Sequence, residues 1–449
     1  MPHVTATPRP TSWSTRLAVG VAGVTASLVG LSTAPVPSAQ ASRPAPASAD
    51  VVLSWNSFAV NLIVGVEKRQ QPESFVFMAY TQAAVYDAVV GVRGGMPAYL
   101  PGLAHRPHAS VAAAVAAAAY GVLSHYFPDQ QSALDGQYKA SLAGVPADDA
   151  MVAGVALGAR AADAVLAARA EDGFTRTVTY TPTPGPGVWQ ATPPAFLPAQ
   201  TPQLATMRPF LLASEAQFRS PPPPALDSDL WAQDENEVKA VGSRTSLTRT
   251  AEQTATAQFW VGNVVIMYNQ LYRQLAVSRH LDARSAARLL VAGDMVGADA
   301  LIACMDAKYH YGFWRPVTAI RAGDTDGRSD TTGDPSWTPL IPTPNHPEYP
   351  SNHGCVTAAA AAITASFLGT EDVSVDLFST ATTTTRHVNT VSDWLTSVAN
   401  GRVWGGIHYR FSTDAGVRLG ATVAQYDLTN SFLATDSDEG VPPLAPRLQ

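Results

Sequence analysis

Cysteine, charge and long apolar runs are all scarce in this 449-residue sequence. Its two cysteines are too few for a disulfide scaffold and lack the spacing of a zinc site. With 46% hydrophobic and 14% charged residues, the chain is too apolar to be disordered, and its apolar residues are too evenly interrupted for a membrane bundle. Its 29 basic residues are outnumbered by 36 acidic ones and form no basic stripe, so nucleic-acid binding lacks electrostatic support. We therefore expect a soluble globular protein in which any anion site is a local concentration of positive charge.

Residues 1–41 have the order of a secretory signal peptide. Arg9 and Arg16 precede an apolar run from Leu17 to Leu31, and the small-residue pattern Ala39-Gln40-Ala41 follows. The run is shorter than the ~20 residues that span a bilayer, which favours export over a membrane anchor. We expect a secreted protein with no membrane-bound part after cleavage.

Helical periodicity dominates the remaining chain. Residues 50–174 predict an N-terminal helical bundle, and residues 230–435 predict a C-terminal bundle that carries the polar motifs described below. The prolines of residues 175–229 cannot sustain helices and predict a long connection, either a wall of a site or a surface spacer. Because no strand–helix–strand alternation occurs, the expected fold is all-α, two packed helical bundles with long Pro- and Gly-rich connections. The individual helices are expected over residues 51–91, 110–127, 147–172, 252–274, 283–305, 354–368, 385–401 and 414–432.

Three short segments of the second half concentrate the unusual polar residues. The first, residues 308–316, places the cations Lys308 and Arg315 seven positions apart at the end of an apolar helix. Seven residues are about two turns, so both side chains can point to one side if the helix continues. The planar fork of an arginine and the point charge of a lysine together suit a tetrahedral oxyanion.

The other two segments contain histidines between glycines and prolines. Residues 346–354 form a Pro-bracketed loop that leads into a helix, whose free backbone N–H groups favour an anion. Residues 401–411 surround an arginine and a histidine with glycines that permit close backbone approach. A single histidine or arginine is more often structural or solvated. Their combination in an acidic chain predicts an oxyanion site.

The order Lys-x6-Arg-Pro, Pro-Ser-x-His and Arg-x5-His resembles the signature shared by vanadium haloperoxidases and type 2 phosphatidic acid phosphatases, closest to secreted bacterial vanadium haloperoxidase-like proteins. The resemblance implies a vanadium chloroperoxidase-like fold and a vanadate or phosphate site. It implies that His353 is the acid–base residue and that His408 is the metal ligand or the phosphoryl nucleophile. The residues that would hold the oxygens of the anion are Lys308, Arg315, Ser351, Asn352 and Arg402.

Several positions depart from that pattern. Asn352 stands where the family commonly has glycine, and Ser412 stands where many of the phosphatases have the aspartate that orients the third-motif histidine. The partner of His408 is therefore open. Met305 and His346 replace the aromatic residues that shape the halide site of the fungal chloroperoxidases, and a histidine at the second position is more like the bromoperoxidases. His346 is thus the candidate halide-site residue.

Three functions remain possible for such a site. The long soluble chain and His346 favour a vanadate-dependent haloperoxidase that oxidises halide, bromide rather than chloride, with hydrogen peroxide and a small organic substrate. The alternatives are a secreted acid phosphatase that cleaves a phosphate monoester through a phosphohistidine, and a non-catalytic anion-binding helical protein. Cys304 and Cys355 adjoin two of the motifs, so a disulfide and two buried thiols are both possible.

Overall fold

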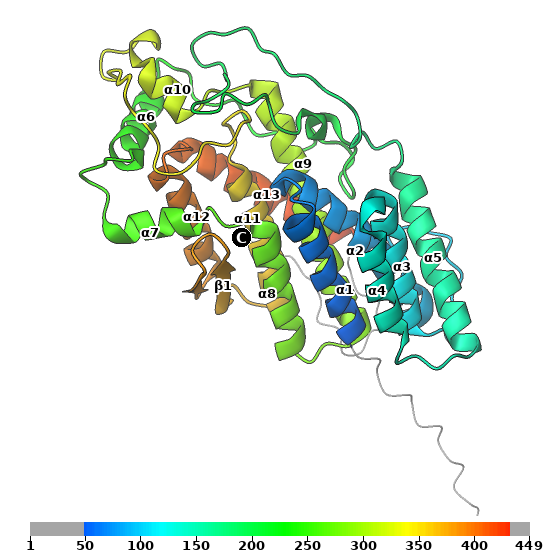
Figure 1. Ribbon diagram of the computed structural model, residues 1–449. Coiled ribbons are helices and arrows are strands. Elements are labelled where there is room, and N and C mark those ends of the chain that lie inside the picture. Colours follow the sequence, from blue (N-terminus) through cyan, green and yellow to red (C-terminus); the bar gives the residue numbers. More distant parts are fainter. Residues whose placement is uncertain (1–48, 432–449) are drawn as a thin grey trace, which may run out of the picture. The chain divides into compact units, whose positions relative to one another are not determined.

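The computed structural model describes residues 49–431, so the predicted signal peptide lies outside the described residues. Residues 49–431 fall within one compact unit. Nearly all of the regular structure in this range is helical, and the strands are confined to one short hairpin (Figure 1). The predicted all-α class is confirmed. The division into bundles at residues 174 and 230 stays a prediction.

The first half forms helices where its caps and apolar spacing predict them. Ser110 caps α3 by accepting a hydrogen bond from the Ala113 N–H, and Asp148 caps α5 through the Met151 N–H. The helix α4 was not expected, because its face is mostly polar. The elements are α1 (Asp50–Val60), a π-helical turn (Asn61–Val66), α2 (Gln71–Arg93), α3 (Val111–Tyr126), a 3₁₀ turn (Pro128–Gln130), α4 (Gln131–Leu142) and α5 (Asp149–Arg169).

The predicted connection contains a single short 3₁₀ helix, Pro202–Thr206. Backbone hydrogen bonds hold it to the second half: the Trp189 N–H donates to the Gly312 carbonyl at 2.7 Å, and the Gln200 N–H donates to the Asn345 carbonyl at 2.8 Å. The buried Asp299 carboxylate accepts three consecutive backbone N–H groups, beginning with that of Phe210. The connection is therefore an ordered part of the protein rather than a free spacer.

The second half is organised around α9, a 29-residue helix that is buried along most of its length. Helices α2, α8, α11 and α13 all pack against it, so one helix links the first half of the chain to the polar motifs. The elements of this half are α6 (Asp229–Gly242), α7 (Ala251–Phe259), α8 (Val264–Ser278), α9 (Ala283–Tyr311), α10 (Pro316–Arg321), a 3₁₀ turn (Gly323–Thr325), α11 (Asn352–Leu368), β1 (Val375–Ser379), β2 (Thr384–Val388), α12 (Val391–Trp404) and α13 (Arg410–Asn430).

Three expected helices differ from the structure. The helix expected at residues 51–91 is divided, because α1 and the π-helical turn end at Val66 and α2 begins only at Gln71. The helix expected at residues 385–401 begins only at Val391, because residues 384–388 pair antiparallel with β1. This stretch is rich in threonine, whose branched side chain favours a strand over a helix. The helix expected at residues 252–274 is broken after α7, where the Asn263 side chain accepts backbone N–H groups and starts α8.

Two of the described helices, α2 and α5, are long and apolar enough to cross a membrane. The most apolar stretch of α2 is 100% buried inside the protein, which is the pattern of a core helix.

Candidate active site

The first motif changes direction between its two cations. Helix α9 ends at Gly312, whose φ of +58° is the left-handed conformation that glycine adopts readily. The assumption that the helix continues from Lys308 to Arg315 is therefore wrong. Lys308 lies in the last turn of α9, and Arg315 is an extended residue just before Pro316 and α10. Both side chains are fully buried, and hydrogen bonds to the other two motifs bring them together.

Arg315 links the second and third motifs. Its Nε donates to the His346 carbonyl and one terminal nitrogen to the Ile407 carbonyl, both at 2.9 Å. The same nitrogen lies 3.4 Å from Nε2 of His408, and the other lies 3.0 Å from Nδ1 of His346. Lys308 reaches the second motif as well, where its Nζ donates to the carbonyls of Pro347 at 3.0 Å and Glu348 at 2.8 Å. These cations hold the loops of the site in place.

The second motif ends at the N-terminus of α11. Ser351 caps this helix by accepting from the Gly354 N–H at 3.5 Å, which leaves its hydroxyl proton free to donate elsewhere. Asn352 and His353 form the first turn, where backbone N–H groups have no partner within the helix. Helix α13 packs closely here, since a Cβ on Gly416 would lie 2.4 Å from the Ser351 carbonyl oxygen.

Arg402 comes from the last turn of α12. One terminal nitrogen of its guanidinium donates to the Trp260 carbonyl at 2.5 Å, and its Nε is buried without a hydrogen-bond partner among the described residues. Nε2 of His353 is also buried and has no hydrogen-bond partner among residues 49–431. Leaving a buried polar atom unpaired costs about 1–3 kcal/mol, so both nitrogens favour a ligand or a water molecule.

His408 is held by a carboxylate that the sequence reasoning did not assign. Its Nδ1 lies 2.6 Å from Oε1 of Glu348, and the two side chains are 2% and 0% exposed. The Tyr409 N–H donates to the same oxygen at 3.1 Å. The Ser412 hydroxyl, at the position of the aspartate that many of the phosphatases have, lies 3.5 Å from Nδ1. Glu348 therefore takes the orienting role that Ser412 cannot fill.

The site surrounds a cavity of about 190 Å³. Among the predicted site residues, those that line it are His346, Asn352, His353, Arg402 and His408. Lys308, Arg315 and Ser351 are not part of this lining. Arg315 contacts the lining residue His346, Lys308 is bonded to the carbonyls of Pro347 and Glu348, and Ser351 directly precedes Asn352. The cavity is completed by Gln71 and Pro72 at the start of α2 and by Gln200 of the connection. Two helix N-termini, of α2 and α11, thus meet at a cavity beside three cations, which favours an anion.

Burial controls the charges around this cavity. It lowers the pKa of Lys308 to about 8, that of Arg315 to about 10 and that of Arg402 to about 9, and Arg315 lowers the other two pKa values further. Burial also raises the pKa of Glu348 to about 7, although the nearby Lys308 and Arg315 oppose that rise. Three buried cations face a single buried carboxylate. An oxyanion bound among them would therefore relieve their mutual repulsion.

The three histidines are neutral at pH 7. Burial lowers the pKa values of His346, His353 and His408 well below 6.5, and the adjacent arginines lower them further. The contact between His408 and Glu348 is thus a hydrogen bond from a neutral imidazole rather than an ion pair. With its proton on Nδ1, His408 carries a lone pair on Nε2, the form in which an imidazole binds a metal or attacks phosphorus.

The two cysteines meet behind the site. Both are buried free thiols. The Cys304 thiol donates to the Pro350 carbonyl at 3.7 Å and contacts Cys355 through a side-chain hydrogen bond. The two motif segments therefore lie together, as the sequence suggested. In the structure the two cysteines are thiols and not a disulfide.

Sequence reasoning missed Glu348 although the residue lies inside the second motif. A carboxylate among cations and histidines, combined with the missing aspartate at Ser412, was the available signal. Its partner His408 is 60 residues further along the chain. Gln71, Pro72 and Gln200 were missed as well, and no local pattern marks them.

The fold and the site together define a helical protein with a cavity lined by three histidines and an arginine. Residues 288–433 match the family described as the VCPO second helical-bundle domain. The vanadium chloroperoxidase of Curvularia inaequalis is 31% identical over a stretch that covers 33% of this chain and 29% of that protein. The chain therefore spans less than a third of the curated relative that it matches.

Two solved structures share the fold over most of the chain. One is described as the first bacterial vanadium-dependent iodoperoxidase, with a TM-score of 0.74 at 24% identity, over 88% of this chain and 100% of that one. The other is a holo-type bacterial vanadium-dependent chloroperoxidase, with a TM-score of 0.64 at 17% identity, over 80% of this chain and 91% of that one. The predicted resemblance to the superfamily of vanadium haloperoxidases and type 2 phosphatidic acid phosphatases is confirmed. The fold is that of the vanadium chloroperoxidases.

Proposed function

We propose that this protein is a vanadate-dependent haloperoxidase that oxidises halide with hydrogen peroxide, bromide in preference to chloride, and acts outside the cell. The observation that carries the proposal is the position of the buried His408, whose Nδ1 lies 2.6 Å from Oε1 of Glu348 and whose Nε2 lies 3.4 Å from a terminal nitrogen of Arg315 beside the cavity. The similarity to a vanadium chloroperoxidase and to bacterial vanadium haloperoxidases supports it.

The donors around the cavity suit a tetrahedral oxyanion. Arg402 Nε and His353 Nε2 are buried atoms without partners among the described residues, and three cations outnumber the single carboxylate. Lys308, Arg315, Ser351, Asn352 and Arg402 would hold the oxygens of vanadate, with His408 as its ligand. When bound, vanadate would supply the Lewis-acid chemistry that turns hydrogen peroxide into an oxidant of halide.

The protein's own groups would prepare and complete this chemistry. Glu348 keeps the proton of His408 on Nδ1, which leaves Nε2 free as a ligand. His353 is neutral and has an unpaired Nε2, so it can accept the proton that hydrogen peroxide loses and return it to the leaving oxygen. The arginines neutralise negative charge in a buried site, where each interaction is stronger than in water.

The halide preference rests on His346. Its imidazole lines the cavity and contacts Arg315, so the wall is polar where the fungal chloroperoxidases have an aromatic ring. Export rests on the signal-like residues 1–41. N-terminal sequencing of protein recovered from culture medium tests export, and a mature end near Ser42 is the expected result.

The deciding experiment is bromination of a phenol dye by the purified protein, with bromide and hydrogen peroxide, with and without orthovanadate. We expect turnover that requires vanadate and is lost in His408→Ala. The matched control is His387→Ala, which removes a histidine paired with Asp376 at 2.8 Å on the surface. Vanadate-inhibited hydrolysis of a phosphate monoester without bromination would identify a phosphatase. Oxyanion binding with neither activity would identify a binding protein.

A further inference from the structure

A second cavity lies next to the active site, on the other side of Ile341 and Pro342. It has a volume of about 490 Å³, against about 190 Å³ for the oxyanion cavity, and these two residues line both. Its rim also includes Asn345, the neighbour of His346. The two cavities therefore share a thin wall, and a volume of this size suits a small organic molecule.

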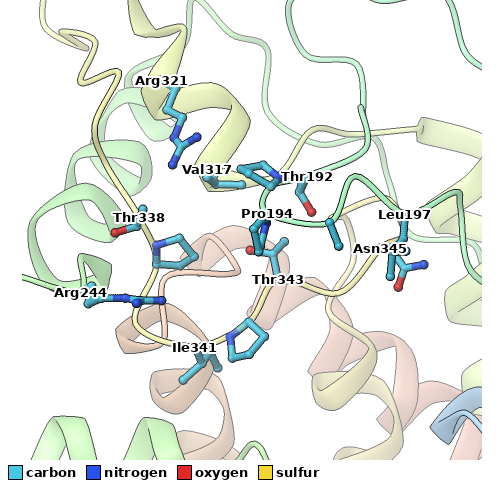
Figure 2. Close-up of a pocket in the computed structure, with 14 residues that line it drawn as sticks. Thr192, Pro194, Leu197, Arg244, Val317, Arg321, Thr338, Ile341, Thr343 and Asn345 are labelled. Atoms are coloured by element: carbon cyan, nitrogen blue, oxygen red, sulfur yellow. The ribbon is translucent and has the colours of Figure 1, made fainter.

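The lining of this pocket is apolar along most of its length. Prolines of the connection and of residues 339–342, together with Leu197 and Val317, form its walls. Val317 and Ile341 are buried, whereas Leu197 is half exposed at the mouth. Figure 2 shows Leu197 and Asn345 at one side of the pocket, opposite two arginines. A flat apolar ring fits between such walls.

The two arginines, Arg244 and Arg321, make the opposite side cationic (Figure 2). Arg321 is held by a hydrogen bond from its Nε to the Trp337 carbonyl at 2.8 Å, which leaves its terminal nitrogens available. The backbone N–H of Arg244 is anchored to the Thr338 carbonyl at 2.8 Å, while its guanidinium is exposed. Among residues 49–431, neither guanidinium is paired with a carboxylate. Two unpaired guanidinium groups beside apolar walls complement an organic anion.

We propose that this pocket binds the organic substrate of the enzyme, an aromatic carboxylate whose ring lies on the proline walls and whose anion meets Arg244 and Arg321. The proposal rests on the proposed haloperoxidase function. In the overall reaction the halide gives two electrons to hydrogen peroxide and the halogen replaces a ring hydrogen that leaves as a proton. That proton and one further proton from the solvent join the two peroxide oxygens to give two water molecules. Holding the ring beyond Ile341 and Pro342 places it next to the cavity where the halide is oxidised.

Binding can be measured without vanadate, halide or peroxide. The probes are 4-hydroxybenzoate and its neutral methyl ester, titrated by ligand-observed NMR. We expect saturable binding that favours the acid. Arg244→Ala should reduce that preference by about fivefold, the upper range for one exposed ion pair. Arg160→Ala, which removes an exposed arginine of α5, is the matched control and should leave it unchanged. Ala195→Trp, at an exposed lining position, should weaken both probes by filling the pocket.

Equal preference for the acid in the wild type and in Arg244→Ala would overturn the proposal. So would displacement of the probe by phosphate that is equally strong in the wild type and in Arg244→Ala, because the probe would then occupy the oxyanion cavity. Oxidation of iodide to triiodide reports the proposed function separately, since it needs no organic substrate. Normal iodide oxidation without specific probe binding would refute the pocket alone. Specific probe binding without any halide oxidation would leave an organic-anion site and refute the haloperoxidase.

Discussion

Replacement of Glu348 by glutamine tests the central contact of the site. The amide oxygen can still accept the His408 Nδ1–H and the Tyr409 N–H, so the geometry is preserved and only the charge is removed. A hydrogen bond to a charged group contributes about 1.5–3 kcal/mol and a neutral one about 0.5–1.5 kcal/mol. Replacing the charged acceptor by a neutral one therefore costs about 1.4 kcal/mol of hydrogen-bond energy, which corresponds to about tenfold weaker binding of vanadate through His408.

The same substitution acts in the opposite direction on an anion that forms no bond to His408. Removing a buried negative charge near Lys308 and Arg315 makes the cavity more positive, so phosphate should bind as tightly as before or more tightly. We therefore expect the ratio of vanadate affinity to phosphate affinity to fall about tenfold or more in Glu348→Gln. Isothermal titration calorimetry with each anion measures this ratio. Glu235→Gln, which changes a buried carboxylate with a similarly raised pKa of about 7, is the matched control.

The pH dependence supplies an independent check. Burial raises the pKa of Glu348 from 4.5 to about 7, so the carboxylate is charged above that pH and loses its charge as the pH falls through it. The advantage of the wild type over Glu348→Gln should be present at pH 8 and disappear by about pH 6. Vanadate and phosphate themselves change charge in this pH range, so the wild type and Glu348→Gln are compared with each other at the same pH. An equal loss of affinity for both anions, or a difference independent of pH, would refute an orienting role for Glu348.

Four further substitutions test the remaining parts of the site. His408→Ala should abolish tight vanadate binding and bromination, and a mutant that still binds vanadate tightly would remove His408 from the ligand role. Arg402→Ala should weaken oxyanion binding by about 10- to 100-fold through the loss of a charge-assisted hydrogen bond. Arg315→Ala should weaken binding and lower Tm further than Arg402→Ala does, because Arg315 holds two backbone carbonyls and Arg402 holds one. His346→Phe should leave vanadate affinity nearly intact and change bromide turnover and its pH optimum, and identical pH profiles would assign it no part in halide oxidation.

The features that could be predicted from the sequence are those encoded within a few neighbouring residues. Helix caps such as Ser110 and Asp148, the apolar spacing of the helices and the proline content of residues 175–229 report local preferences. The three motifs could be recognised because each is compact and their order along the chain is retained. These local signals predicted the all-α class and selected five of the residues that line the cavity, namely His346, Asn352, His353, Arg402 and His408.

Tertiary structure decided the features that depend on distant segments. Glu348 meets His408 because Arg315, Lys308 and the close packing of α13 on α11 fold one loop against another, and nothing near Glu348 in the sequence encodes that contact. The same holds for Gln200, which a backbone hydrogen bond to Asn345 holds at the cavity. Apolar periodicity and helix caps reflect interactions within one segment. The hydrogen bond between His408 and Glu348 depends instead on how deeply two distant segments are buried and how close they come. Only the folded chain sets those two quantities.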